Sequence, residues 1–168
     1  MLKVGDIAPS FCAPNQDDVE ICSRDLAGKW IVLYFYPKDL TPGCTTQACD
    51  FTDKHSFFDD LDAVILGVST DDTEKHRKFI DKYDLTITLL SDINKKMCED
   101  YGVWQLKQFM GKEFMGVVRT TFIINPEGKI AAIWDKVSVR KKKSVKGEKI
   151  EVLHVDEVRE KLQELQSN

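Results

Sequence analysis

The chain has 168 residues, the size of one ordinary domain, so we expect a single domain over residues 1–168. Hydrophobic residues make up 42% and charged residues 31% of the sequence, which excludes a disordered chain, a collagen-like fibre and a disulfide-dense miniprotein. The formal net charge of −4 argues against nucleic acid as the main partner.

The elements expected from the pattern begin with residues 30–36, a β-branched and aromatic run typical of a strand buried on both faces. Residues 45–61 show a helical pattern, and residues 63–69 form a second buried strand. The two strands should therefore be parallel with a right-handed crossover. The segment Asp71-Asp72-Thr73 is expected to supply the N-cap of a charged helix that runs to about residue 83.

Further along, residues 120–124 and 129–134 flank an Asn-Pro-Glu-Gly turn, which indicates a β-hairpin. Residues 155–166 form an amphipathic helix. This order of elements predicts an α/β fold with a central mixed β-sheet flanked by helices, which is compatible with a thioredoxin-like architecture.

No apolar run is long enough to span a bilayer, since the longest covers only residues 30–36. The first residues do not resemble a signal peptide, because Asp6 and Pro9 come before any apolar stretch. We therefore predict a cytoplasmic protein with no membrane partner.

The five cysteines are an odd number, which in a reducing compartment does not suggest a structural disulfide framework. There is no Cys-x-x-Cys spacing, and the three histidines are far from the cysteines in sequence, so no metal site is expected. We interpret Cys12, Cys22 and Cys98 as packed side chains, with redox activity as the alternative for the first two. At least one thiol should be present for its reactivity.

Residues 136–149 differ from the acidic remainder of the chain. They include seven basic residues and one acid, a net charge of +6 against −10 for the rest. One interpretation is a solvated loop or β-ribbon before the last helix. The other is a basic docking surface for an acidic protein or for nucleic acid.

Cys44 is the strongest candidate for a nucleophile, because it lies where a buried strand ends and a helix begins. A thiol at that position is close to unpaired backbone N–H groups and to the positive end of the helix dipole, both of which favour the thiolate. The turn residues around it suggest that the thiol is exposed.

Cys49 lies on the same predicted helix, about 140° around the axis from Cys44 and about 7.5 Å further along it. A disulfide needs Cα atoms within about 7 Å and converging Cβ vectors. Either the two cysteines never pair, or the first turns of the helix must unwind.

The segment YFYPKDLTPGCTTQACDF at residues 34–51 resembles the active-site signature of the peroxiredoxins. It is most similar to the subgroup called bacterioferritin comigratory protein or peroxiredoxin Q. The similarity continues through residues 67–71, 101–104 and 115–122 and covers about residues 3–135. The Pro-x-x-x-Thr-x-x-Cys spacing, with an arginine before a later strand, is specific for this family.

The resemblance implies a thiol peroxidase that reduces hydrogen peroxide and organic hydroperoxides without a cofactor. Cys44 matches the peroxidatic cysteine and Cys49 the resolving cysteine, which implies a Cys44–Cys49 disulfide in the oxidised enzyme. Thioredoxin or a similar dithiol would reduce that disulfide. We expect a monomer or weak dimer, with a role in antioxidant defence.

By the same resemblance, Thr41 and Arg119 hold the peroxide and the thiolate, while Pro37, Gly43 and Gln47 shield or support the pocket. Many relatives have glutamate where this chain has Gln47. The amide can still accept a hydrogen bond from Arg119, but without the ionic component.

Two other functions compete with the peroxidase. A thiol–disulfide oxidoreductase fits the architecture but is weakened by the missing Cys-x-x-Cys. A non-catalytic redox sensor would use oxidation of Cys44 to change a partner interface through the basic segment.

Overall fold

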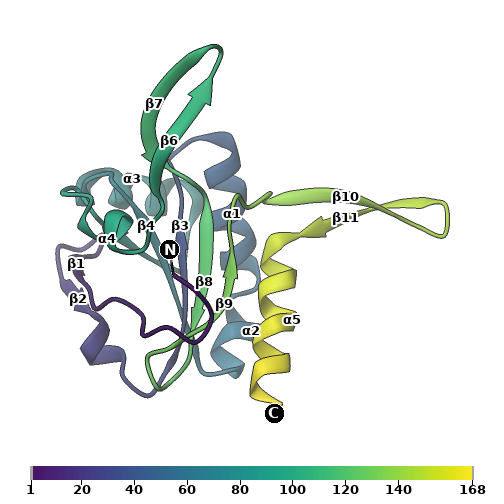
Figure 1. Ribbon diagram of the computed structural model, residues 1–168, viewed down its shortest axis with the longest axis horizontal. Coiled ribbons are helices and arrows are strands. Elements are labelled where there is room, and N and C mark those ends of the chain that lie inside the picture. The colour runs from purple at the N-terminus through teal and green to yellow at the C-terminus, as the bar shows by residue number, and fades with distance from the viewer. Residues whose placement is uncertain (1, 168) are drawn as a thin grey trace.

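The computed structural model describes residues 2–167 and contains a central five-stranded sheet (Figure 1). The strands are β3 (Trp30–Phe35), β4 (Ala63–Ser69), β5 (Thr88–Ser91), β8 (Thr120–Ile124) and β9 (Ile130–Trp134). Their spatial order is β5-β4-β3-β8-β9. The pairs β3–β4 and β4–β5 are parallel, whereas β8 is antiparallel to both β3 and β9. The mixed sheet expected from the sequence is confirmed.

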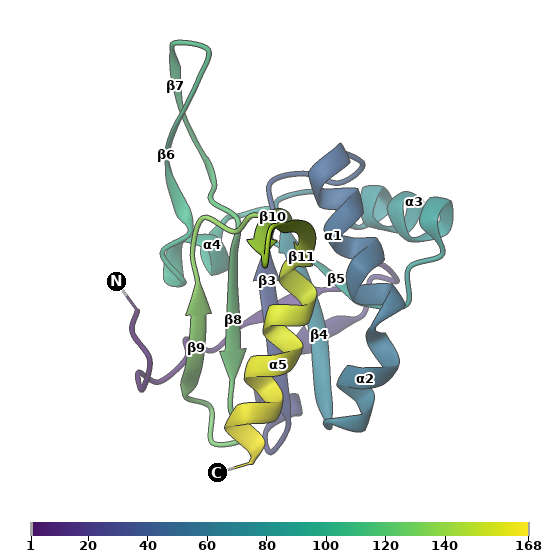
Figure 2. The ribbon, with the colours of Figure 1, turned by 90° about the vertical axis from the view of Figure 1, so that its right-hand side faces the viewer.

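Helices cover the two faces of this sheet unequally. They are α1 (Pro42–Asp53), α2 (His55–Asp60), α3 (Thr73–Tyr83), α4 (Lys96–Asp100) and α5 (His154–Gln166), with a 3-10 turn at Ser23–Leu26. The helices α1, α2, α3 and α5 pack in one core layer, and α4 packs on the other face (Figures 1 and 2). Within residues 2–167, no helix is both long and apolar enough to cross a membrane.

Strand β3 corresponds to the continuous apolar run at residues 30–36, and it is covered on both faces. Val32 and Tyr34 pack in the core layer under α1, while Leu33 and Phe35 pack in the layer on the opposite face. Successive side chains of a strand point to opposite faces. A strand covered on both sides therefore buries every side chain, which favours apolar residues along its whole length.

The helical prediction for residues 45–61 was correct in type but not in continuity. The structure has two helices, because Lys54 ends α1 and begins α2 with φ −102° and ψ 7°. Helix α3 begins as expected, with the Asp72 carboxylate accepting a hydrogen bond from the backbone N–H of Lys75 at 2.8 Å.

Three antiparallel ribbons lie outside the central sheet: β1 (Cys12–Pro14) with β2 (Glu20–Cys22), β6 (Trp104–Phe109) with β7 (Lys112–Val117), and β10 (Arg140–Val145) with β11 (Glu148–Leu153). The last two project from the body (Figure 1). The β10–β11 pair confirms the β-ribbon interpretation of the basic segment. The β6–β7 pair was not predicted, because its strands lack a clean alternation of apolar and polar residues.

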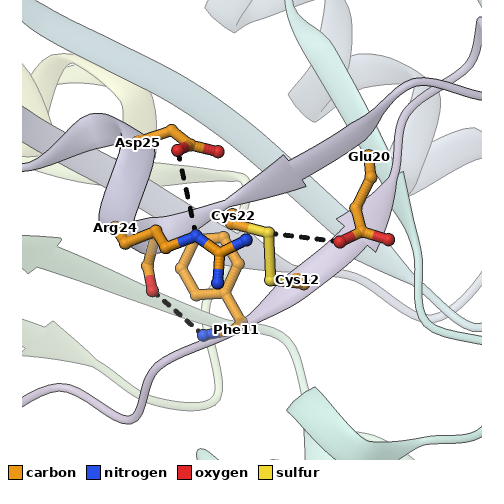
Figure 3. Close-up of a disulfide and its surroundings, with 7 residues drawn as sticks. Phe11, Cys12, Glu20, Cys22, Arg24 and Asp25 are labelled. Carbon is orange, nitrogen blue, oxygen red and sulfur yellow. Dashed lines mark hydrogen bonds and ion pairs between the residues drawn. A yellow bond between two sulfur atoms is a disulfide. The ribbon is translucent and has the colours of Figure 1, made fainter.

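The expectation of no structural disulfide was wrong, because Cys12 and Cys22 are bonded to each other (Figure 3). Cys22 is buried as expected, whereas Cys12 is exposed. They are direct partners across β1–β2, with Cα atoms 4.0 Å apart. The neighbouring pair is hydrogen bonded from Ser23 N to Phe11 O, so Cys12 and Cys22 form a non-hydrogen-bonded pair, in which side chains approach most closely. Their pairing depends on strand register.

Cys98 is confirmed as a packed side chain. It is fully buried in the core layer that also contains Met97 and Tyr101. Burial raises the pKa of its thiol well above the ordinary value, and the Asp92 carboxylate raises it further. A thiol in this environment stays protonated and is a poor nucleophile.

Candidate active site

The candidate site begins at the N-terminus of α1, beyond the end of β3. Thr41 precedes the helix in an extended conformation, and Pro42 occupies the first helical position. The hydrogen bond from Thr45 N to Thr41 O, at 2.8 Å, is the first of the helix. The N–H groups of Gly43 and Cys44 precede this bond and so have no acceptor within the helix. Cys44 therefore lies at the positive end of α1.

Arg119, just before β8, supplies the positive side chain of the site. Its Nη2 donates to Cys44 Sγ at 3.4 Å and its Nη1 donates to Gln47 Oε1 at 2.7 Å. The expected Arg119–Gln47 hydrogen bond is confirmed. A Cβ on Gly43 would lie 3.2 Å from Arg119 Nη2, so the glycine makes room for the guanidinium. These four residues form one cluster.

The Cys44 side chain is only 2% exposed, so the expectation of an exposed thiol was wrong. Cys44, Ala48 and Phe51 are at helical spacing and share the face of α1 that packs on the sheet, where Phe51 stacks on Tyr34 at 4.6 Å. The helix face therefore decides the burial of the thiol, whatever the turn residues before it. Only a small reactant can reach the sulfur without displacing its neighbours.

Thr41 and Pro37 lie in the loop that leads into this cluster. Thr41 Oγ1 donates to Lys38 O at 2.8 Å, and within residues 2–167 no hydrogen bond joins this hydroxyl to Cys44. Pro37 is half-buried just after β3. The structure thus brings Arg119 to the thiol and Gln47 to Arg119, and it leaves Thr41 at the helix cap.

Cys49 lies further along α1 in a different environment. Its thiol is free, like that of Cys44, and half-buried. Burial raises its pKa, and the carboxylates of Asp53 and Asp50 raise it further, while the Arg140 guanidinium opposes them. In the structure, an unbroken helix carries both thiols.

A buried polar network that no sequence pattern singled out holds the loop before α1. The Asp39 carboxylate accepts from Tyr36 Oη at 2.5 Å and lies 2.5 Å from His76 Nδ1. His76 Nε2 lies 2.9 Å from Leu90 O, and Asp39 N donates to the Asp71 carboxylate at 2.8 Å. The His76 side chain is fully buried, although its neighbours on α3 are charged. Only the fold shows that this histidine fixes the loop next to Cys44.

Lys107 on β6 was also missed, because it comes from a ribbon that was not predicted. Its Nζ donates to Val117 O at 2.9 Å. Burial lowers its pKa, the positive charge of Arg119 lowers it further, and Cys44 opposes this effect. The ribbon therefore adds a second cation to the electrostatic surroundings of the thiol.

Comparisons with known proteins agree with this geometry. Residues 4–133 match the AhpC/TSA family. The chain is 49% identical over 139 residues to Peroxiredoxin Bcp of Bacillus subtilis (strain 168), covering 83% of this chain and 88% of that protein. It is 45% identical over 134 residues to Peroxiredoxin Bcp of Escherichia coli (strain K12), covering 80% and 86% of the two chains.

Solved structures give the same result over almost the whole chain. The bacterioferritin comigratory protein of Xanthomonas campestris superposes with a TM-score of 0.81 at 33% identity, covering 98% of each chain. A mutant of Xylella fastidiosa PrxQ superposes with a TM-score of 0.84 at 29% identity, covering 99% and 98%. These relatives favour the peroxidase over the oxidoreductase and sensor alternatives. The chain belongs to the AhpC/TSA family and is a peroxiredoxin of the Bcp/PrxQ group, a thiol-dependent peroxidase.

Proposed function

We propose that Cys44 is the peroxidatic nucleophile, that Arg119 stabilises the charges of the reaction, and that Cys49 is the resolving thiol. The observation that carries this proposal is the Arg119 fork, which donates to Cys44 Sγ and is fixed by Gln47. The neutral amide of Gln47 leaves the guanidinium charge uncompensated. The positive charge of Arg119 therefore acts on Cys44 Sγ without a negative charge on Gln47 to weaken it.

In the first step the Cys44 thiolate attacks the terminal oxygen of a hydroperoxide. An S–O bond forms, the O–O bond breaks, and the leaving alkoxide or hydroxide takes up a proton to give an alcohol or water. Cys44 is left as a sulfenic acid. Full ionisation of an ordinary thiol of pKa about 8.5 gains only about thirty-fold at pH 7. Arg119 and the free N–H groups of the helix terminus supply the remaining acceleration by stabilising the charge on the departing oxygen.

In the second step Cys49 attacks the sulfenic sulfur, a disulfide forms and water leaves. The two cysteines diverge by about 140° on an intact helix, so residues 44–50 must unwind first. The N-terminal turn is suited to this, since helix ends are the parts that open at the lowest free energy. A thioredoxin-type dithiol then returns both cysteines to thiols.

The burial of Cys44 selects small peroxides and excludes bulky reagents. Alkyl peroxide reduction activity is described for the Xanthomonas campestris relative, and we extend the proposal to organic hydroperoxides as well as hydrogen peroxide. We assign antioxidant defence to one peroxiredoxin domain over residues 1–168. A cytoplasmic location, a monomeric or weakly dimeric state and the lack of nucleic-acid and membrane partners stay predictions.

Disulfide mapping by mass spectrometry after one equivalent of hydrogen peroxide tests the assignment. Wild type should give a Cys44–Cys49 linked peptide. Cys49→Ser should stop at a Cys44 sulfenic acid, detected by mass as the addition of one oxygen, which excess peroxide overoxidises. Cys98→Ser is the matched control and should behave as wild type. Full turnover by Cys49→Ser would contradict the proposal.

Hydrogen exchange tests the unwinding separately. Oxidised protein should exchange amide protons faster than reduced protein between residues 45 and 53, with β4 unchanged. Unchanged exchange in a protein with a mapped Cys44–Cys49 disulfide would show that the helix need not open.

A further inference from the structure

The basic segment forms a shaped element, which we call the basic arm (residues 140–153). It consists of β10 and β11 and projects away from the body, as Figure 1 shows. Lys146 and Gly147 connect the strands with φ values of 52° and 81°, the positive angles of a tight two-residue hairpin turn. The arm is therefore a regular hairpin. Most of its side chains are exposed and do not contribute to the hydrophobic core.

Positive charge is concentrated on this arm and is only partly neutralised by nearby acidic groups. Arg140 and Lys141 pair with acidic groups, but Lys142, Lys143, Lys146 and Lys149 have no ion pair within residues 2–167. All four of these side chains are exposed.

One face of the arm also carries apolar side chains. Lys143 is opposite Ile150, and Val145 lies two residues beyond Lys143, so these three share a face. Val145 is 41% and Ile150 is 43% exposed. Glu148 is opposite Val145 on this face, whereas Lys142 and Lys149 lie on the other face. An apolar pair next to Lys143, on an arm with further exposed lysines, fits a protein surface on which carboxylates lie beside an apolar patch. The arm has no aromatic side chain on which a nucleic-acid base could stack.

The root of the arm is attached to the active-site helix next to Cys49. Arg140 Nη2 and Nε donate to the two carboxylate oxygens of Asp50 at 2.6 and 3.1 Å. Arg140 Nη1 also donates to Glu151 at 3.3 Å within the arm. Asp50 is only 2% exposed and is the residue after Cys49. In the structure, the root of the arm thereby lies beside Cys49, the proposed resolving cysteine.

We propose that the basic arm is the docking surface for an acidic protein dithiol that reduces the oxidised enzyme at Cys49. This inference rests on the proposed Cys44–Cys49 disulfide. One partner thiolate attacks Cys49 Sγ, forms a mixed disulfide and releases the Cys44 thiolate, which takes up a proton. The second partner thiolate attacks the partner sulfur of the mixed disulfide and releases Cys49, which is also protonated. The partner loses two electrons and the enzyme gains two.

The surroundings of the two cysteines explain the choice of sulfur. The better leaving thiolate departs faster in thiol–disulfide exchange. Cys44 has Arg119 and the helix terminus to stabilise its negative charge, whereas Cys49 is next to the carboxylates of Asp50 and Asp53. Attack on Cys49 releases Cys44, which returns to Arg119 and the helix terminus when α1 re-forms, and Cys49 is the cysteine beside the root of the arm.

The test measures reduction of the peroxide-oxidised enzyme by stopped flow, with a thioredoxin of acidic isoelectric point or with dithiothreitol as reductant. The variant is Lys142→Gln/Lys143→Gln/Lys146→Gln, which removes three positive charges from the arm. We expect its second-order rate constant with the thioredoxin to fall by about tenfold or more. Its rates with dithiothreitol and with hydrogen peroxide should equal those of wild type.

The matched control is Lys3→Gln/Lys29→Gln/Lys129→Gln, which removes the same charge from exposed lysines outside the arm. It should be reduced by thioredoxin at the wild-type rate. Raising the ionic strength from about 0.01 M to 0.15 M shortens the screening length from about 30 Å to 8 Å, which should slow wild type and control but not the arm variant.

Three other outcomes would each contradict a proposal. Equal thioredoxin rates for the arm variant and wild type would overturn the docking proposal. Binding of a DNA duplex that the arm variant loses, with thioredoxin rates unchanged, would overturn it in favour of nucleic acid. Failure of wild type to turn over with dithiothreitol would instead contradict the proposed Cys44–Cys49 cycle itself.

Discussion

Cys44 and the Cys12–Cys22 pair lie on opposite faces of the central sheet. The two regions differ in burial, in the charge of the nearest side chain and in whether a second sulfur is within reach. Cys44 is buried in the layer under α1, with the Arg119 guanidinium at 3.4 Å from its sulfur. The Cys12–Cys22 pair belongs to the β1–β2 ribbon on the other face. Cys12 is exposed, and Glu20 Oε1 lies 3.3 Å from Cys22 Sγ (Figure 3).

The contrast shows what decides whether a cysteine stays a free thiol or forms a disulfide. The deciding features are the charge of nearby groups and the presence of a second sulfur within bonding distance. A cation and a helix N-terminus favour a thiolate, whereas a carboxylate disfavours it. Cys44 has the first environment and no cysteine opposite it. Cys22 has the second, and strand register places another sulfur within bonding distance. One region therefore has a free thiol, and the other forms a covalent link.

The largest expected effect is on peroxide turnover, which should depend on Cys44 and not on the Cys12–Cys22 pair. Cys44→Ser should abolish peroxide turnover, because an alcohol is neither ionised nor comparably nucleophilic at neutral pH. Cys12→Ser/Cys22→Ser is the matched change in the other region and should keep wild-type turnover. Stopped-flow consumption of hydrogen peroxide measures both. Loss of turnover in the double variant would place chemistry in both regions.

Removing the cation is expected to have the next largest effect. Arg119→Met should slow the oxidation of Cys44 by about 10²–10³-fold, the range for loss of a fixed donor to developing charge. Arg119→Lys retains the charge without the two-pronged geometry and should give an intermediate rate. If Arg119→Met reacts at the wild-type rate, the cation does not distinguish Cys44 from the other cysteines.

The covalent region should show its effect in stability. The Cys12–Cys22 disulfide closes a short loop with a sequence separation of 10, and its loss should lower the free energy of unfolding by about 2–3 kcal/mol. Urea unfolding of the Cys44→Ser protein with and without dithiothreitol measures this change. Adding Cys12→Ser/Cys22→Ser to that protein should remove the effect of dithiothreitol on stability. An effect that persisted would show that the Cys12–Cys22 disulfide is not its cause.

The smallest effect concerns the neutral partner of Arg119. Gln47→Glu would place a carboxylate 2.7 Å from Arg119 Nη1 and compensate part of the charge that faces Cys44. We expect oxidation by hydrogen peroxide to slow by a few-fold, up to about tenfold. Gln105→Glu is a matched control on β6 and should leave the rate unchanged. A faster Gln47→Glu enzyme would show that ordering of the guanidinium matters more than its charge.

The elements that could be predicted from the sequence are those with a strong local pattern. The buried strands β3 and β4 and the capped helix α3 follow from runs of a few residues, so they were placed correctly. The ribbons β1–β2 and β6–β7 were not predicted, because their stability comes from pairing and their sequences alternate poorly. The Arg119–Gln47 contact was expected from the family resemblance and not from local pattern.

The sequence by itself determined that Cys44 lies at a strand–helix junction and that residues 34–51 carry a peroxiredoxin signature, because both are properties of contiguous residues. Tertiary structure alone decided that this thiol is buried, that Cys12 and Cys22 are bonded, and that Arg140 joins the basic arm to Asp50. Each of these depends on which helix face meets the sheet, or on the register of strands that pair. Such contacts join residues far apart in the chain, 90 positions for Arg140 and Asp50, so no local pattern of residues encodes them.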